Sequence, residues 1–299
     1  MRELDGAQAA AQKEPVSIVI PAYNEAGSIG PTLEQVQATL AEAELDGEII
    51  VVDDGSKDGT AAEVARYPDV RLIRHTQNRG YGAALKTGIR QANYDVIAIL
   101  DADGTYPCEM IPRLVAEIGT YDMAVAARTG AKVHIPLVRR PAKWALNRLA
   151  NYLTGMEIPD LNSGMRAFKR DVVTSFFRLL PSGFSFTTTI TLAMLTNDYN
   201  VINIPANYYP RTGQSKINPV RDTINFFSLV VRMVLSFRPM RVFVPLALVF
   251  FTLSLIKVVY DIILYDFHLA TSTVVLVTLT FQLAVLGMVA DLVVSLHRS

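Results

Sequence analysis

Two long apolar runs near the end of the chain constrain its fold more than any other feature. Residues 242–264 and 272–296 are each long enough to cross a hydrocarbon core of about 30 Å as a helix. The segment between them contains Asp266 but no lysine or arginine, whereas arginines precede the first run and follow the second. Because positive residues stay on the cytoplasmic side, the pattern predicts a membrane hairpin with both ends in the cytoplasm. Two buried helices of a large soluble core are the alternative.

Charged residues interrupt both runs. Lys257 and Asp261 are four residues apart, so they share a helix face and are expected to pair with each other. Asp291 lies near the cytoplasmic end of the second run. Because charges in a membrane usually face protein, an oligomer contact or a lipid path is the functional alternative to a self-satisfied pair.

An amphipathic segment precedes the two runs. In residues 219–238, apolar side chains recur every three or four positions, and arginines and polar side chains fall on the opposite face. The pattern predicts a helix that lies in the membrane interface, and we assign the interfacial segment to residues 219–241. A helix packed on the preceding domain is the alternative.

The composition excludes several classes of protein. Lys+Arg and Asp+Glu both number 28, so no global basic character points to nucleic acid. Cys108 is the one cysteine, which excludes an intrachain disulfide framework and fits a reducing compartment. Residues 1–14 are polar and expected to be flexible, and they lack the apolar stretch of a signal peptide. We therefore expect the polar part of the chain to be cytoplasmic.

Residues 15–210 alternate between strand and helix patterns. The predicted strands are residues 16–20, 48–52, 70–73, 96–100 and 121–126. The predicted helices are residues 28–45, with Ser28 as N-cap, and residues 58–66, 80–92 and 107–119. This rhythm is typical of an α/β domain with a mostly parallel sheet and helices on both faces.

One of these strands ends in two carboxylates. The apolar residues 96–100 run directly into Asp101-Ala102-Asp103-Gly104. Mg²⁺ and Mn²⁺ take oxygen ligands and commonly use one or two carboxylates together with substrate phosphates. Because open α/β sheets bind ligands at the carboxyl ends of their strands, the pair indicates a metal site facing a diphosphate. An acidic solvated turn is the alternative.

Other loops point to the same edge of the sheet. The first strand ends in Pro21-Ala22-Tyr23-Asn24-Glu25, and the second in Asp53-Asp54-Gly55-Ser56-Lys57-Asp58-Gly59-Thr60. Several carboxylates therefore converge there and need a cation or hydrogen-bond donors. Tyr23 suits stacking on a base, and Asp53 can accept from a base N–H or a ribose hydroxyl. The glycines of residues 78–86 suggest a role in shaping the donor pocket, although they lack P-loop spacing, and a plain helix start is the alternative.

Together these motifs resemble family 2 glycosyltransferases of the GT-A fold. The resemblance covers about residues 15–240, and the motifs occur in the family's order and spacing. Asn162-Ser163-Gly164-Met165-Arg166-Ala167-Phe168 and Arg211-Thr212-Gly213-Gln214-Ser215-Lys216 resemble the polyprenyl-phosphate glycosyltransferases, which include dolichol-phosphate mannose synthases and bactoprenol glucosyltransferases. Two C-terminal spans match the bactoprenol type best. The resemblance implies transfer of one sugar from a nucleotide sugar to a lipid phosphate, with inversion and a divalent metal.

The resemblance also implies roles for individual residues. The nucleoside would be held by Pro21, Tyr23, Glu25 and Asp53. Asp101 and Asp103 would bind Mg²⁺ or Mn²⁺ and, with Ala102, Arg211 and Lys216, the rest of the donor. Arg128 would contact the acceptor phosphate together with Arg139 and Arg140. Arg128, Asp101 and Asp103 would be the catalytic residues. Thr105 stands where mannose synthases have a glutamine ligand, so metal binding by this residue is doubtful.

One departure from the family bears on the acceptor. Many inverting members carry a Glu-Asp pair where this chain reads Phe184-Ser185-Phe186-Thr187-Thr188-Thr189. A sugar hydroxyl acceptor must lose a proton to a base, whereas a lipid phosphate is already an anion and needs neutralisation and positioning. Arginines suit that work, so the missing acids favour a phosphate acceptor. Simple helix packing by the threonines is the alternative.

The sequence thus predicts four segments: a flexible N-terminus over residues 1–14, a GT-A domain over 15–218, an interfacial helix over 219–241 and a transmembrane hairpin over 242–299. We expect a membrane-bound homo-oligomer that moves one sugar, with UDP-glucose favoured, to a polyprenyl phosphate. The alternatives are a GDP-mannose-dependent synthase and a non-catalytic binding protein for sugar nucleotides or lipid carriers. A processive polysaccharide synthase is disfavoured, because Trp144 is the one tryptophan and follows Pro141-Ala142-Lys143 rather than Gln-x-x-Arg.

Overall fold

The computed structural model describes residues 14–129, 157–183, 185–210, 239–264 and 269–298, together with positions 148, 151, 152, 155, 231 and 235. The predicted flexible N-terminus and nearly all of the predicted interfacial helix over residues 219–238 lie outside the described residues. The chain divides into two compact units. One comprises Met1–Arg140, Pro159–Met194 and Asp198–Asn218, and the other comprises Pro141–Ile158, Leu195–Asn197 and Pro219–Ser299.

The first unit is built on a seven-stranded sheet with the order β3-β2-β1-β4-β6-β5-β7. Its strands are β1 (Val16–Ala22), β2 (Gly47–Asp53), β3 (Val70–Arg74), β4 (Val96–Ile99), β5 (Met123–Ala127), β6 (Arg166–Lys169) and β7 (Val201–Pro205). All neighbouring pairs are parallel except those of β6, which runs antiparallel to both β4 and β5. The predicted mostly parallel sheet is confirmed, although the sequence pattern did not indicate β6 and β7.

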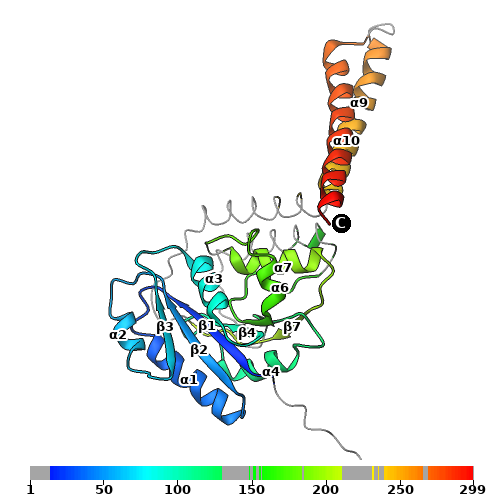
Figure 1. The fold of residues 1–299 in the computed structure, drawn as a ribbon. Helices are drawn as coiled ribbons and strands as arrows, with labels where there is room; N and C mark the ends of the chain where they lie inside the picture. The colour runs from blue at the N-terminus through cyan, green and yellow to red at the C-terminus, as the bar shows by residue number, and fades with distance from the viewer. Residues whose placement is uncertain are drawn as a thin grey trace, which may run out of the picture. The chain divides into compact units, whose positions relative to one another are not determined.

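Helices cover both faces of this sheet (Figure 1). On one face lie α1 (Ile29–Glu42), α2 (Thr60–Val64), the short 3₁₀ helix η1 (Cys108–Met110) and α4 (Ile111–Ala116). On the other lie α3 (Tyr81–Gln91), α6 (Arg170–Ser175) and α7 (Phe186–Thr196). Every residue of β1 is buried, as expected for a parallel strand with helices on both sides.

Two residues noted in the sequence have structural roles in this layer. Ser28 occupies the N-cap position of α1 as predicted, but its hydroxyl does not cap the helix and instead donates to the Glu25 carboxylate at 2.9 Å. Cys108 is buried against the core, and burial raises the pKa of its thiol to about 12. The thiol is therefore protonated and inert at neutral pH.

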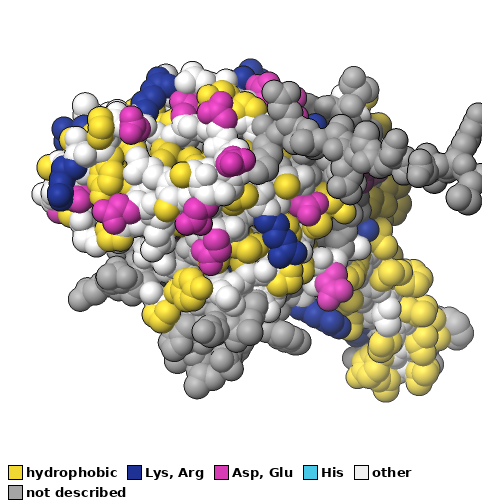
Figure 2. Space-filling view, turned by 90° about the horizontal axis from the view of Figure 1, so that it is seen from below, with side chains coloured by type: hydrophobic (Ala, Val, Ile, Leu, Met, Phe, Trp, Pro, Cys, Tyr) yellow, Lys and Arg dark blue, Asp and Glu magenta, His cyan; other side chains and the backbone are white. Residues whose placement is uncertain are grey.

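The second unit contains two long apolar helices, α9 (Met240–Leu264) and α10 (Thr271–Arg298). Both are long and apolar enough to cross a membrane, and only 6% and 11% of their most hydrophobic windows are buried. Figure 2 shows acidic and basic side chains scattered among one another on the α/β unit, whereas the two helices present an almost continuous hydrophobic surface. The exposure of these apolar side chains argues against the alternative that the two helices are buried in a soluble core.

Polar side chains join the two helices of this hairpin. Lys257 donates to Asp261 at 2.6 Å, which confirms the predicted pair. The second carboxylate oxygen of Asp261 accepts from the Ala270 backbone at 2.8 Å and from the Thr273 hydroxyl. The pair is thus satisfied by the hairpin itself.

Gly88 sets the distance between α3 and the sheet, and we predict that Gly88→Ala destabilises the protein. An added Cβ would lie 2.3 Å from the Val19 side chain, whereas an added Cβ at Gly27 meets nothing within 4 Å. Overpacking costs about 1–3 kcal/mol, which exceeds the gain in helix propensity of up to about 1 kcal/mol. The thermal midpoint in detergent should fall by several degrees, with Gly27→Ala as control. Equal midpoints for the two variants would contradict this packing.

Candidate active site

The candidate site lies at one edge of the sheet, where several strands end or begin. The carboxyl ends of β1, β2 and β4 lie there, as the parallel registers require. Because β6 is antiparallel to β4, with Arg166 opposite Ile99, β6 begins where β4 ends. The residues before β6, 162–165, are therefore brought to Asp101.

Asp101 is held from two sides. The Tyr81 hydroxyl donates to Asp101 Oδ1 at 2.8 Å. Gly164 packs so closely that a Cβ there would lie 2.1 Å from Asp101 Oδ2. Burial and the charge of Asp101 raise the pKa of Tyr81 well above its ordinary value, so its hydroxyl remains a donor. Any other residue at Gly164 would displace the carboxylate.

Asp103 is held by its own turn. Asp103 Oδ1 accepts from the Thr105 backbone at 3.2 Å and from the Thr105 hydroxyl at 2.7 Å. Thr105 therefore orients Asp103, and this role explains the presence of Thr105 without making it a metal ligand. Between the two aspartates, Ala102 is buried, and its carbonyl accepts from Thr32 at 3.4 Å.

The donor chemistry of the two aspartates fits Mg²⁺ or Mn²⁺ shared with a diphosphate. The parts of the chain that the structure describes hold no group of three or more His, Cys, Asp and Glu side chains suited to a metal. Mg²⁺ is usually bound by one or two carboxylates, with waters and phosphate oxygens completing the octahedron. Asp101 and Asp103 would thus hold the ion only in part, and a bound diphosphate would complete the site.

The other carboxylates at this edge have donors of their own. Asp54 accepts from His75 Nδ1 at 2.7 Å and from the backbone N–H groups of Arg79 at 2.9 Å and Gly80 at 2.8 Å. Asp53 is fully buried and accepts from the Ser56 backbone at 2.9 Å and from Arg74 Nε at 3.3 Å. The converging acids are therefore stabilised by hydrogen-bond donors and do not form one metal cluster.

Several polar residues of these motifs join one loop to another. The backbone N–H groups of Asn24 and Glu25 donate to the hydroxyls of Ser56 and Thr60, both at 2.9 Å. The Lys57 backbone donates to Asn24 Oδ1 at 2.8 Å. These bonds fix the loop after β1 against the loop after β2, so both close over one side of the site.

A pocket of about 610 Å³ lies beside these loops. Tyr23 lines it, and Arg74, which is bonded to the buried Asp53, lines it too. Pro21 is buried in β1, and Glu25 is half-buried and bonded to Ser28. The full lining is Tyr23, Gly55, Ser56, Lys57, Arg74, His75, Thr76, Gln77 and Asn78.

The glycines at the start of α3 have a packing role. Gly80 has φ +98°, and a Cβ there would lie 2.5 Å from the Ser182 carbonyl oxygen. At Gly82 a Cβ would lie 2.2 Å from the Pro181 carbonyl oxygen. The Ser182 carbonyl also accepts from the Ala83 backbone at 3.1 Å. Part of this helix start is therefore occupied by protein and is not open to a phosphate. The close packing that the glycines allow places Tyr81 against Asp101.

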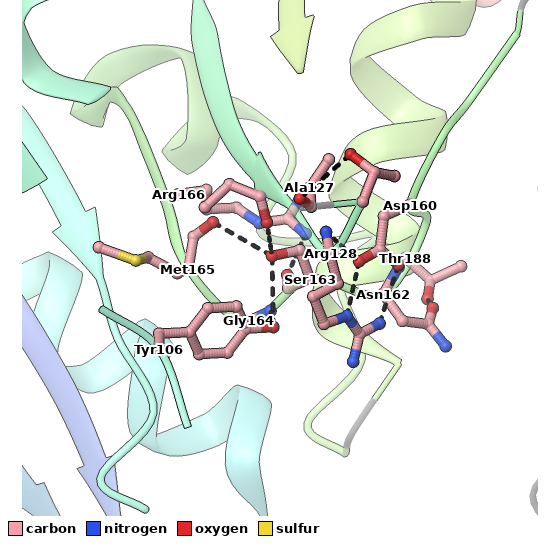
Figure 3. Close-up of polar contacts among 12 residues, drawn as sticks. Tyr106, Ala127, Arg128, Asp160, Asn162, Ser163, Gly164, Met165, Arg166 and Thr188 are labelled. Atoms are coloured by element: carbon pink, nitrogen blue, oxygen red, sulfur yellow. Dashed lines mark hydrogen bonds and ion pairs between the residues drawn. The ribbon is translucent and has the colours of Figure 1, made fainter. Parts of the chain in front are cut away.

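Arg128 is fixed by a buried carboxylate (Figure 3). Its Nε and Nη2 donate to Asp160 at 2.6 and 2.8 Å, and its backbone N–H donates at 3.0 Å. Its guanidinium also lies 5.1 Å from the centre of the Tyr208 ring. Burial disfavours the charged form of Arg128, but the hydrogen bonds that it donates to Asp160 outweigh this effect and raise the pKa of Arg128. Arg128 is therefore a permanent, oriented cation.

A second arginine, Arg166, lies fully buried behind the site. It donates to the Thr187 carbonyl at 3.1 Å, the Thr191 hydroxyl at 2.8 Å and the Ser163 carbonyl. Burial lowers the pKa of Arg166 to about 10, opposed by Tyr81, Tyr106, Asp160 and Asp101, so it is charged at neutral pH. This cation offsets the carboxylates of the site from behind.

Sequence reasoning missed several residues of this network. Tyr81 and Arg166 lie inside quoted motifs but received no role, and the spacing of the motifs could not reveal their contacts. Tyr106, whose hydroxyl accepts from the Gly164 backbone at 2.7 Å, and Asp160 had no motif signal. The expected phosphate contacts Arg139, Arg140, Arg211 and Lys216 lie outside the described residues.

Family models match both units of the chain. The model of glycosyl transferase family 2 matches residues 17–177, and a model described as the GtrB C-terminal hairpin matches residues 238–296. The chain therefore belongs to glycosyl transferase family 2 and is an enzyme of that class.

Curated relatives and solved structures agree with this assignment. An undecaprenyl-phosphate mannosyltransferase of Micrococcus luteus is 28% identical over 68% of this chain and 87% of the relative. An undecaprenyl-phosphate 4-deoxy-4-formamido-L-arabinose transferase of Pseudomonas fluorescens is 33% identical over 73% of this chain and 64% of the relative. Glucosyl-3-phosphoglycerate synthase of Mycobacterium tuberculosis has a TM-score of 0.59 and 18% identity over 74% of this chain and 78% of that one, so it shares the fold.

We predict that Asp103→Asn removes divalent metal from the nucleotide complex. Mn²⁺ binding followed by electron paramagnetic resonance in the presence of UDP should weaken, and turnover should fall at least about 100-fold because the leaving diphosphate loses its counter-charge. Asp69→Asn, at an exposed position of the same unit, is the control. Unchanged Mn²⁺ binding by the Asp103 variant would contradict the metal assignment.

Removal of Arg128 is predicted to affect both stability and transfer. Arg128→Ala breaks the ion pair with the fully buried Asp160; breaking a buried pair costs about 3–5 kcal/mol, so the melting temperature should fall. The double variant Arg128→Met, Asp160→Asn should regain stability but not transfer. Wild-type transfer rates from this double variant would remove Arg128 from the site.

Proposed function

We propose that the enzyme transfers one sugar, with inversion, from a nucleotide sugar to a polyprenyl phosphate at the cytoplasmic membrane face. The two relatives described above are named as transferases acting on undecaprenyl phosphate, and two helices of this chain are long and apolar enough to span a membrane. The observation that carries the proposal is the setting of Arg128. A fixed cation stands at the sheet edge that bears Asp101 and Asp103, and the described first turn of α7 offers threonines and no carboxylate base.

The attacking group would be a phosphate oxygen of the lipid. It forms a bond to the anomeric carbon of the sugar as the bond from that carbon to the nucleoside diphosphate breaks. No proton has to be removed, because the phosphate is already ionised. Arg128 would lower the repulsion between the anionic acceptor and the anionic donor, and Arg166 would support it from behind. A divalent ion held by Asp101 and Asp103 would supply the counter-charge for the leaving diphosphate.

We infer a uridine donor, with UDP-glucose as the favoured substrate. The edge of uracil presents one N–H between two carbonyls, whereas guanine presents two adjacent donors. Each oxygen of Asp53 already accepts one hydrogen bond, and one of these comes from Arg74. Release of the Arg74 bond would free one oxygen of Asp53 to accept from the uracil N–H, and the exposed guanidinium of Arg74 would then donate to a uracil carbonyl. The structures of the Mycobacterium tuberculosis enzyme with UDP and Mn²⁺ or Mg²⁺ support the same choice.

A GDP-mannose donor is the second candidate, because the Micrococcus luteus relative is named a mannosyltransferase. The homo-oligomer expected from the sequence remains a prediction.

The first test is a panel of labelled UDP- and GDP-sugars with undecaprenyl phosphate in detergent, with Mg²⁺, Mn²⁺ or a chelator. We expect a chloroform-soluble product from UDP-glucose that disappears with the chelator and in Asp103→Asn. Product from GDP-mannose alone would replace the uridine assignment. A folded wild-type enzyme that makes no lipid product from any donor would overturn the proposed acceptor.

A further inference from the structure

Asn162 stands beside the fixed arginine and carries an oriented amide. The Thr188 hydroxyl donates to its side-chain oxygen, and its backbone N–H donates to Asp160 Oδ1 at 3.4 Å. Asp160 also binds Arg128, so one buried carboxylate positions both residues. Figure 3 shows Arg128 and Asn162 together at Asp160, with Thr188 beyond Asn162.

Thr188 differs from its neighbours on α7. The hydroxyls of Thr189 and Thr191 donate to carbonyls one turn earlier in the helix, Ser185 at 2.8 Å and Thr187 at 2.9 Å. Such back-bonding is the usual use of a threonine within a helix. The hydroxyl of Thr188 instead reaches across to Asn162, so this helix position holds the amide in one of its two orientations.

The orientation decides what Asn162 can do. Its carbonyl oxygen is engaged by Thr188, so the NH₂ group, with two donors, is the half of the amide left to contact a ligand. Among the described residues, none accepts a hydrogen bond from this nitrogen. Because Arg128 uses Nε and Nη2 for Asp160, the site presents Nη1 of the arginine and Nδ2 of the asparagine. Both are donors, and a phosphate needs donors.

We propose that Asn162 is a substrate-contacting residue whose amide donates to a non-attacking oxygen of the acceptor phosphate, and that Thr188 is its positioning residue. This inference rests on the proposed function. A neutral amide stabilises an anion without taking a proton from it. An aspartate at this position would have the same shape, but its carboxylate would repel the phosphate and offer only acceptors. An asparagine therefore suits a site that binds a phosphate, whereas an aspartate would suit a general base.

The test measures initial rates with undecaprenyl phosphate and UDP-glucose varied separately. In Asn162→Asp, the KM for undecaprenyl phosphate should rise roughly 10- to 100-fold, the range for loss of a hydrogen bond to a charged group, while the KM for UDP-glucose stays within about twofold. Thr188→Val removes only the orienting hydroxyl and should give a smaller rise in the same constant. If Asn162 had a purely structural role, its replacement would change the KM values for undecaprenyl phosphate and UDP-glucose together.

Thr189→Val is the matched control, because it removes a hydroxyl of the same helix that bonds only to the Ser185 carbonyl. Thr188→Val keeps the inference testable if Asn162→Asp does not fold. An unchanged KM for the lipid in Thr188→Val and in any folded Asn162→Asp, with normal wild-type turnover, would overturn the role of Asn162 alone. Absence of lipid product from the wild-type enzyme would overturn the proposed function, and this inference with it.

Discussion

The antiparallel pairing of β6 with β4 is the interaction on which the site depends. A parallel strand at this place would begin at the far edge of the sheet and leave only its carboxyl end near Asp101. Because β6 runs the other way, residues 162–165 arrive at the end of β4, and Gly164 packs directly against the Asp101 carboxylate. The same pairing places Arg166 behind the site and Asn162 beside Arg128. One reversal of strand direction thus joins the donor half of the sheet to the half that holds the arginines.

Three buried carboxylates of the site have hydrogen-bond partners within the protein. Asp160 is buried with Arg128, Asp54 with His75 and two backbone N–H groups, and Asp53 with Arg74. Burial of a charge is costly unless it is paired and hydrogen-bonded, and each of these groups is. Asp101 and Asp103 accept from the hydroxyls of Tyr81 and Thr105, which orient the two carboxylates.

The sequence was sufficient for the α/β class, the parallel strands, the edge that carries the acids and the hairpin with its Lys257–Asp261 pair. These features follow from periodicity and from spacing along the chain, which are local. It could not reveal β6 and β7, because short strands whose pairing is non-local leave little periodic signal. It also could not separate Asp54 from Asp101, since both end apolar strands. Only the fold shows that backbone donors occupy Asp54 and that Tyr81 reaches Asp101.

The carboxylate of Asp261 has a consequence for how the hairpin enters a membrane. Two of its three donors, the Ala270 backbone and the Thr273 hydroxyl, come from the turn into α10 and from α10 itself. A lone α9 would have to enter the bilayer with its carboxylate satisfied by Lys257 only. Since an incompletely satisfied charge is expensive in hydrocarbon, the second helix lowers the cost of the first. If the hairpin crosses a bilayer, the two helices are therefore expected to insert as one cooperative unit.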